Sequence, residues 1–189
     1  MSDRVPKTSG PVESKDLRRF NEMIAGASPE VRTLLDYWIE ARGDRPVPYR
    51  RDIDPMAVPR LLPNMWIYRW DDDADDFVCK LAGETLRQAW GYSIAGMRMR
   101  DFIAAPDYPT VRERWLRIIT VPMAHYGSAN EKLTDPGLMR AERLILPLAS
   151  DDGTVSHVMG LSLYKFDTRR DDRAPLMSED IVQVPCIEL

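Results

Sequence analysis

Apolar residues recur at helical spacing in the first quarter of the chain. They fall at i, i+3, i+4, i+7 and i+8, the positions of Val31, Leu34, Leu35, Trp38 and Ile39. Ser28 is a favoured N-cap and Pro29 suits the first helical turn, whereas Gly43 and Pro46 prevent continuation. The pattern predicts a helix over residues 29–42 whose apolar face lies across a sheet.

Alternation of apolar and polar residues predicts strands further along the chain. The predicted strands cover residues 64–70, 77–82, 142–149 and 155–166, with a weaker candidate for an edge strand over residues 127–133. The acidic tract Asp71–Asp76 joins the first pair, and Ser150–Gly153 is a strong hairpin signal between the last two. We expect the tract to be a solvated turn. A divalent-ion site is the alternative, although the tract lacks the alternating ligands and glycine of a calcium loop.

Helical patterns fill the interval between the two strand pairs. Short helices are predicted over residues 84–90 and 98–103, followed by a long helix over residues 107–121 that ends before Pro122. A further short helix is predicted near the N-terminus, over residues 17–24. Strands, short helices, a longer helix and strands again indicate an α+β domain with an antiparallel sheet.

The order of several short motifs resembles a known family. The motifs are Tyr37-Trp38, RGDRPVPYR (Arg42–Arg50), RDIDP (Arg51–Pro55), RLLPN (Arg60–Asn64), LAGETL (Leu81–Leu86), GYSIAG (Gly91–Gly96) and LILPLASDDG (Leu144–Gly153). Over about residues 29–166 the chain is similar to the PAS-like domain family of alphaproteobacteria, the PAS_5-type family formerly described as a domain of unknown function. The resemblance implies a five-stranded antiparallel sheet with helices packed on one face, often with a pocket between them. It supplies no ligand and no catalytic residues.

The resemblance also divides the chain into three segments. We expect residues 1–28 to be a partly disordered N-terminal extension that carries a helix, and residues 29–168 to be the PAS-like domain. Residues 169–189 are expected to be a C-terminal tail that is mobile or docks elsewhere.

Composition narrows the function classes. The formal net charge of −4 argues against a general nucleic-acid binder, and no apolar run reaches the length of a membrane span. The N-terminus has no apolar segment typical of a secretory signal, and two cysteines form no disulfide framework. We therefore expect a cytoplasmic protein that binds neither nucleic acid nor membrane.

Sequence motifs for catalysis and for common cofactors are missing. No nucleophile elbow, Walker loop, dinucleotide-binding glycine motif or C-x-x-C pair is present, so we do not expect an enzyme. Cys79 lies in a predicted strand rather than in the Asn-Cys-Arg setting of flavin photosensors, and is expected to be a small core residue. The predicted long helix has no histidine that could hold haem, and His125 and His157 are not expected to be ligands. The cofactor is thus unknown, with no flavin or haem signature and no metal site.

Aromatic and methionine side chains suggest a ligand pocket. In a PAS-like arrangement the candidate lining residues are Trp90, Tyr92, Met97, Met99, Phe102, Trp115, Ile119, Met123, Leu146, Met159 and Leu161. Such a lining suits an apolar or planar small molecule, because methionine adapts its shape. The same residues also fit a filled core, and the sequence leaves both interpretations open.

Three hypotheses follow for the function. The first is a stand-alone sensory or regulatory module that binds a small molecule, a protein partner or both, and signals through protein–protein interaction. The second is a ligand-free interaction adaptor with a filled core, and the third is a small enzyme. We expect a homodimer, with residues 17–24 and 29–42 as the dimerisation elements.

Overall fold

A computed structural model describes residues 14–134, 137–166 and 180–189 of the protein. Its centre is a six-stranded sheet with the spatial order β2-β1-β5-β4-β3-β6, in which each neighbouring pair is antiparallel. The strands are β1 (Met65–Asp71), β2 (Asp76–Ala82), β3 (Met123–Thr134), β4 (Gly137–Ala149), β5 (Val155–Phe166) and β6 (Asp180–Pro185). Residues 1–13 of the predicted extension and residues 169–179 of the predicted tail lie outside the described part of the chain.

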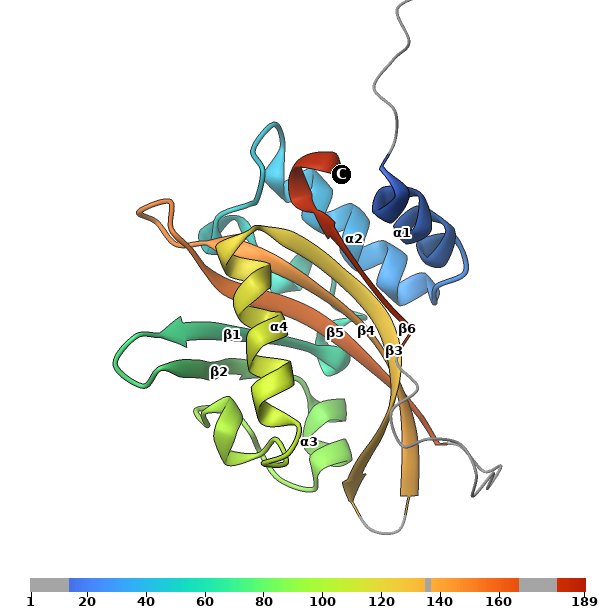
Figure 1. Ribbon diagram of the computed structural model, residues 1–189, viewed down its shortest axis with the longest axis vertical. Helices are drawn as coiled ribbons and strands as arrows, with labels where there is room; N and C mark the ends of the chain where they lie inside the picture. Colours follow the sequence, from blue (N-terminus) through green and yellow to red (C-terminus); the bar gives the residue numbers. More distant parts are fainter. Residues whose placement is uncertain (1–13, 135–136, 167–179) are drawn as a thin grey trace, which may run out of the picture.

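Helices cover both faces of the sheet (Figure 1). The α-helices are α1 (Lys15–Ala25), α2 (Pro29–Arg42), α3 (Glu84–Trp90) and α4 (Tyr108–Thr120). Short 3-10 turns lie at η1 (Arg50–Asp52), η2 (Pro55–Ala57), η3 (Leu62–Asn64), η4 (Met99–Asp101) and η5 (Cys186–Glu188). The helices predicted on one face of the sheet correspond to α3 and α4. The helix α1 of the N-terminal extension and the helix α2 cover the opposite face.

The α2 helix packs as its apolar stripe predicts. Val31, Leu34 and Trp38 are fully buried against the sheet. The indole Nε1 of Trp38 donates a hydrogen bond to the carbonyl oxygen of Pro147 in β4, at 2.9 Å. Burial of these three side chains removes enough apolar surface to contribute several kcal/mol, about 1.5–3 kcal/mol for each large side chain. The helix is therefore an integral part of the folded core on this face of the sheet.

The sixth strand corrects the predicted strand count. Residues 180–185, assigned to the tail from the sequence, pair with β3 and bury Val182 and Val184. Just beyond them, the carbonyl oxygen of Cys186 accepts a hydrogen bond of 2.6 Å from Nη1 of Arg42 at the end of α2. The predicted weak edge strand over residues 127–133 is consequently part of the longer strand β3, which β6 flanks over Met123–Ser128; of the predicted range, Gly127 and Ser128 pair with β6 among the described residues.

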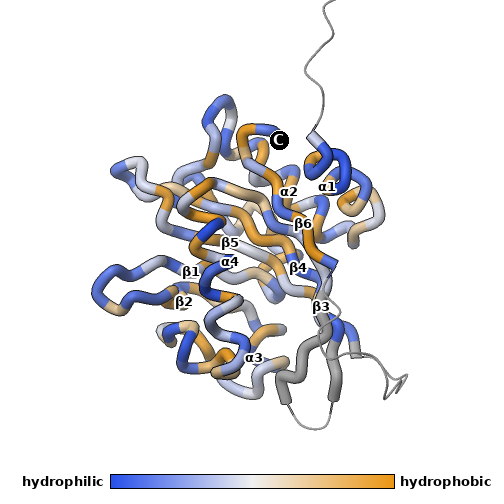
Figure 2. Tube along the Cα trace, viewed as in Figure 1, coloured by the Kyte–Doolittle hydropathy of each residue, from blue (hydrophilic) through white to orange (hydrophobic). Residues whose placement is uncertain are grey.

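Apolar residues follow the strands of the sheet and the inner sides of the helices (Figure 2). Alternation along β1 shows how one strand serves two cores. Met65 and Ile67 face α2, whereas Trp66 and Tyr68 face α4. Within the described residues, no helix is both long enough and apolar enough to cross a bilayer.

Candidate functional site

Aromatic rings occupy the space between the sheet and α4. The rings of Trp66 and Trp115 stack with centroids 5.0 Å apart and planes only 5° from parallel. Tyr68 presents an edge to both indoles, at 5.4 and 5.1 Å, and Phe77 presents an edge to Trp115 at 5.5 Å. These offset and edge-to-face geometries are the favourable ones for aromatic pairs. We call these four residues the aromatic cluster.

The sheet beneath the aromatic cluster is shaped to receive Trp66. Gly160 of β5 is the direct cross-strand partner of Trp66. A Cβ atom at position 160 would lie 2.3 Å from Cζ2 of the indole, so only glycine leaves room for the ring. The indole Nε1 donates a hydrogen bond of 2.9 Å to the hydroxyl of Ser162, which is 1% exposed. That hydroxyl also accepts a hydrogen bond of 3.0 Å from Nε of Arg143. The polar groups at this edge of the aromatic cluster are therefore hydrogen-bonded to one another.

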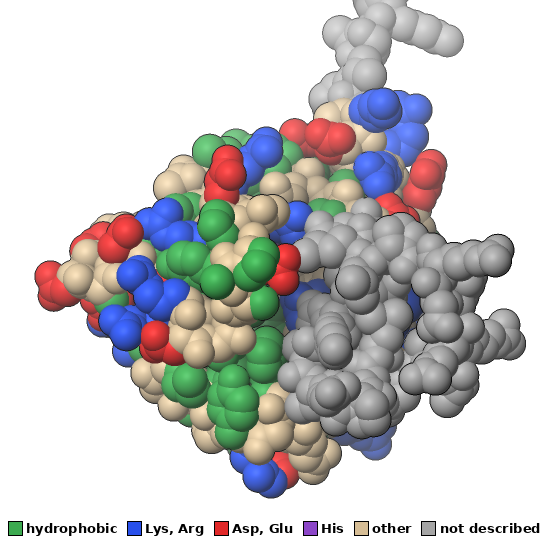
Figure 3. All heavy atoms as spheres, turned by 60° about the horizontal axis from the view of Figure 1, so that its bottom comes forward, with side chains coloured by type: hydrophobic (Ala, Val, Ile, Leu, Met, Phe, Trp, Pro, Cys, Tyr) green, Lys and Arg blue, Asp and Glu red, His purple; other side chains and the backbone are tan. Residues whose placement is uncertain are grey.

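A second layer of aromatic residues links the cluster to α3. The ring of Phe102 lies 6.3 Å from Tyr68 and 5.2 Å from Trp90, the last residue of α3. Apolar side chains gather on the face of the molecule that carries α3 and the segment after it (Figure 3). Tyr92 contributes the most exposed of these large side chains, at 45%.

The predicted pocket residues are divided between the two faces of the sheet. On the α4 side lie Trp90, Met97, Met99, Phe102, Trp115 and Ile119. Leu146, Met159 and Leu161 face α2 instead. Tyr92 is half-exposed, and Met123 is buried at the start of β3. Period-two alternation identifies which strand residues share a face but not which helices cover that face, and this explains the mixed list.

Two residues considered for cofactor binding lie in the core. Cys79 is buried, as predicted, and burial raises the pKa of its thiol to about 11. His125 of β3 is 4% exposed, and its Nδ1 lies 3.3 Å from Nε2 of Gln183. Burial lowers the pKa of His125 to about 3, with Arg114 and Arg143 adding to the effect. The imidazole is therefore neutral near pH 7 and is enclosed by protein.

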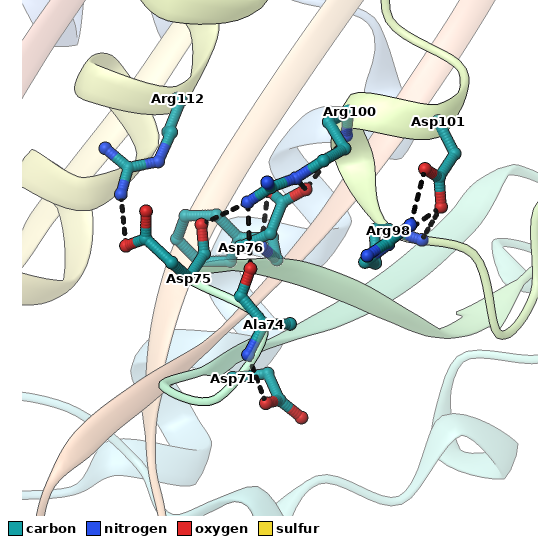
Figure 4. A network of polar contacts seen from close by, with 9 residues as sticks. Asp71, Ala74, Asp75, Asp76, Arg98, Arg100, Asp101 and Arg112 are labelled. Atoms are coloured by element: carbon teal, nitrogen blue, oxygen red, sulfur yellow. Dashed lines mark hydrogen bonds and ion pairs between the residues drawn. The ribbon is translucent and has the colours of Figure 1, made fainter.

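An ion-pair clamp joins the β1–β2 hairpin to the segment that carries α3 and α4 (Figure 4). The carboxylate of Asp76 is completely buried and accepts two hydrogen bonds from Arg100 of η4: Nε at 2.9 Å and the backbone N–H at 3.0 Å. Nη2 of the same arginine donates to the carbonyl oxygens of Ala74 and Asp75, at 2.8 and 2.7 Å. The other carboxylate oxygen accepts the backbone N–H of Phe77 at 2.8 Å, so Asp76 is fully hydrogen-bonded and Arg100 ties it to the hairpin loop.

The acidic tract is thus only partly the solvated turn that its sequence predicts. Asp75, whose side chain is 71% exposed, pairs with Nη2 of Arg112 in α4 at 2.6 Å. Asp71 accepts from the backbone N–H of Ala74 at 3.1 Å, which closes the loop. Asp76, by contrast, is an interior anchor. Among the described residues, no group of three or more acidic, histidine or cysteine side chains could hold a metal ion.

Comparison with known proteins identifies a family for most of the domain. A family model described as a PAS domain matches residues 27–163. No curated protein matches the chain.

Solved structures with a similar arrangement include VqmA bound to DPO, at a TM-score of 0.47 and 13% identity. That match covers 60% of this chain and 57% of VqmA, so the chain spans less than two thirds of its length. A structure described as "Flavin Analogue Sheds Light on Light-Oxygen-Voltage Domain Mechanism" matches at 0.44 and 16% identity, over 58% of this chain and 82% of that one. An RNA-binding light-oxygen-voltage receptor matches at 0.44 and 21% identity, over 58% and 32%.

Proposed function

The chain belongs to the PAS domain family, and from this premise we propose that it is a regulatory module that signals through contact with a protein partner. PAS folds serve broadly as sensors and interaction modules. The proposal places the signal on the surface of the domain rather than in a ligand held at its centre.

The observation that carries this proposal is the stacked pair Trp66 and Trp115. Their rings, with Tyr68 and Phe77, occupy the interior between the sheet and α4, where a small molecule would otherwise lie. A ligand entering there would have to separate rings whose edges and faces already satisfy each other, which would forfeit about 0.5–1.5 kcal/mol per pair in addition to the buried area. This supports the adaptor with a filled core over the sensor with an internal ligand.

We propose no catalytic role for the buried titratable groups. His125 is enclosed by protein, and its lowered pKa makes it a weak base. The thiols of Cys79 and Cys186 have pKa values raised by burial to about 11 and about 12, so little nucleophilic thiolate is present near neutral pH.

We also propose that the chain self-associates, but through other faces of α1 and α2 than their apolar ones. The apolar faces of α1 and α2, named from the sequence as dimerisation elements, pack on the chain's own sheet through residues such as Phe20 and Trp38. A second copy would therefore meet the outward, more polar faces of these helices. Such contacts bury less apolar surface and favour a concentration-dependent dimer over a permanent one.

Site-specific photocrosslinking in the host cell tests the proposed function. A photoreactive amino acid replaces, one at a time, the exposed large apolar residues Met56, Tyr92, Val121 and Ile187, which lie in different segments of the chain. We expect a discrete adduct of constant mass from at least one position. Native mass spectrometry of the purified chain should show no retained small molecule. Absence of adducts at all four positions, together with a retained organic ligand, would overturn the proposal.

A further inference from the structure

A groove of about 530 Å³ lies where β4 ends and β5 begins, outside the site described above. Its lining consists of Arg50, Arg51, Ser150, Asp151, Asp152 and His157. The backbone N–H of Ala149 donates to the carbonyl oxygen of Pro48 at 2.9 Å and ties the segment before η1 to the end of β4. The two consecutive arginines of η1 are thereby held beside the β4–β5 turn.

His157 lines the groove, and serine hydroxyls contact its ring. Nδ1 lies 3.1 Å from Oγ of Ser156, which is itself 2.6 Å from Oγ of Ser150. When a serine hydroxyl donates to Nδ1, the ring proton of a neutral imidazole resides on Nε2. That tautomer leaves an N–H donor on the side of the ring away from the serines.

Positive charge surrounds the imidazole from three elements. Burial lowers the pKa of His157 to about 4, and the further causes are all cationic: Arg50 of η1, Arg69 of β1 and Lys80 of β2. Arg69 is paired with Asp71, at 3.1 Å. Within the part of the chain that the structure describes, neither Arg50 nor Lys80 takes part in an ion pair. The charged groups that act on the ring are thus cations, while the groove lining also carries Asp151 and Asp152, and Nη1 of Arg50 donates to the carbonyl oxygen of Ile53 at 3.2 Å.

The two carboxylates that line the groove already have hydrogen-bond partners. Asp151 pairs with Nη1 of Arg51 at 2.9 Å, and Asp152 accepts the backbone N–H of Thr154 at 2.9 Å within the turn. The Arg51–Asp151 pair is exposed on both sides, 56% and 78%, and such pairs contribute only about 0–1 kcal/mol. The guanidinium of Arg51 also lies over the ring of Tyr49, at 4.3 Å. This cation–π contact would keep the guanidinium in place if an anion replaced Asp151 as its partner.

We propose that this groove binds a phosphate group, with Arg50, Arg51 and the Nε2–H of His157 as donors. An oxyanion accepts charge-assisted hydrogen bonds from guanidinium forks, and such bonds are stronger than neutral ones. Binding brings a negative charge beside His157 and stabilises its protonated form. The inference is separate from the proposed function: a phosphate site here stands or falls whether or not a protein partner is found.

The chain has only two histidines, which gives the test an internal control. Proton NMR follows the imidazole signals during titration with inorganic phosphate, pyrophosphate and O-phosphoserine, at constant ionic strength set with chloride. We expect saturable shifts of the His157 signal and a rise of its pKa from about 4, with the buried His125 unmoved. Tighter binding of O-phosphoserine than of inorganic phosphate would identify a phosphorylated side chain as the source, and the reverse a free phosphate.

Matched variants connect the shift to the named donors. R50Q should weaken phosphate binding about tenfold or more, since a charge-assisted hydrogen bond contributes about 1.5–3 kcal/mol. R50K keeps the charge and should recover part of the affinity. R87Q removes an exposed arginine of α3 outside the groove and should change nothing. Shifts that do not saturate, that occur equally with chloride, or that saturate with the parent's affinity in R50Q would overturn the phosphate site.

Discussion

The indole ring of Trp66 lies over the backbone of Gly160, its partner across the β1–β5 pair, with no room for a side chain between them. A Cβ at position 160 would come within 2.3 Å of Cζ2 and 2.6 Å of the carbonyl oxygen of Leu144. Neither the stacked indole nor the strand backbone can move far. The whole stack over β5 therefore depends on the absence of one methyl group.

Gly160→Ala should consequently destabilise the fold by about 2–3 kcal/mol, the upper part of the range for overpacked cores. Urea denaturation followed by tryptophan fluorescence measures the change. Gly26→Ala is the matched control, because a Cβ there would meet only the carbonyl oxygen of Met23 at 3.7 Å, and its free energy of unfolding should be nearly unchanged. Equal stability of the two variants would show that Trp66 can move aside.

The clamp between Asp76 and Arg100 yields a second prediction. Arg100→Gln leaves a completely buried carboxylate without its cation, although the backbone N–H groups of Phe77 and of residue 100 still donate to it. Because the lost guanidinium is itself 38% exposed, we expect a cost of about 1–3 kcal/mol, that of an incompletely satisfied buried group. Asp75→Asn breaks the neighbouring pair with Arg112, in which the aspartate side chain is 71% exposed, and should cost less than about 1 kcal/mol. Chemical denaturation of both variants makes the comparison. A similar small loss in each would mean that Asp76 is reached by water or protonated in the fold.

The local elements of this fold were largely predictable from the sequence. The α2 helix spans Pro29–Arg42, as its stripe and caps indicate, and α4 lies within the predicted long helix. In both cases the signal is contained in a short window: an apolar period of 3.6 residues, a proline near the start and a stop at the end.

Long-range relations were not predictable in the same way. Strand β6 is six residues long, and nothing local to it reveals that it pairs with β3, more than fifty positions earlier. Leu146 and Met159 alternate correctly yet face α2 rather than α4, because both faces of the sheet are apolar. Asp76 closes a run of acidic residues that indicates solvent exposure, and only its distant partner Arg100 explains its burial. The residues of the proposed phosphate groove, Arg50, Arg51 and His157, are visible in the sequence. Nothing in the sequence indicates that they lie together in the fold.

Glu142 of β4, which is partly buried against Ser28 at the start of α2, gives a third prediction. Its carboxylate accepts hydrogen bonds from the backbone N–H and the hydroxyl of Ser28, at 2.9 and 2.5 Å, and from the hydroxyl of Tyr126 at 2.9 Å. Burial acts to raise the pKa of Glu142, but these bonds outweigh it and hold the pKa below its usual value. Glu142→Gln should cost about 1–3 kcal/mol and raise hydrogen exchange in the first turn of α2. Glu30→Gln, at an exposed position of the same turn, should leave exchange unchanged.

The buried imidazole of His125 makes stability depend on pH. Its pKa in the folded protein is about 3, against about 6.5 in the unfolded chain. The unfolded state therefore binds a proton that the folded state excludes. Stability is complete above about pH 6.5 and falls as the pH drops, by up to about 1.4 kcal/mol per pH unit, until the folded histidine itself protonates. His157, whose pKa is lowered to about 4, contributes over a narrower window, from about pH 6.5 to about pH 4, so its total effect on stability is smaller.

Urea midpoints measured across this window test the assignment, because the two histidines can be removed separately. His125→Gln keeps a polar side chain beside Gln183 and removes the titration, so its stability should fall less steeply below about pH 6.5 than that of the parent chain. His157→Gln should remove the smaller of the two total losses, and phosphate should narrow the window of that loss by raising the pKa of His157. A parent chain whose stability is flat between about pH 6.5 and about pH 4.5 would show that His125 protonates within the folded core, and that the β3–β6 edge opens to water.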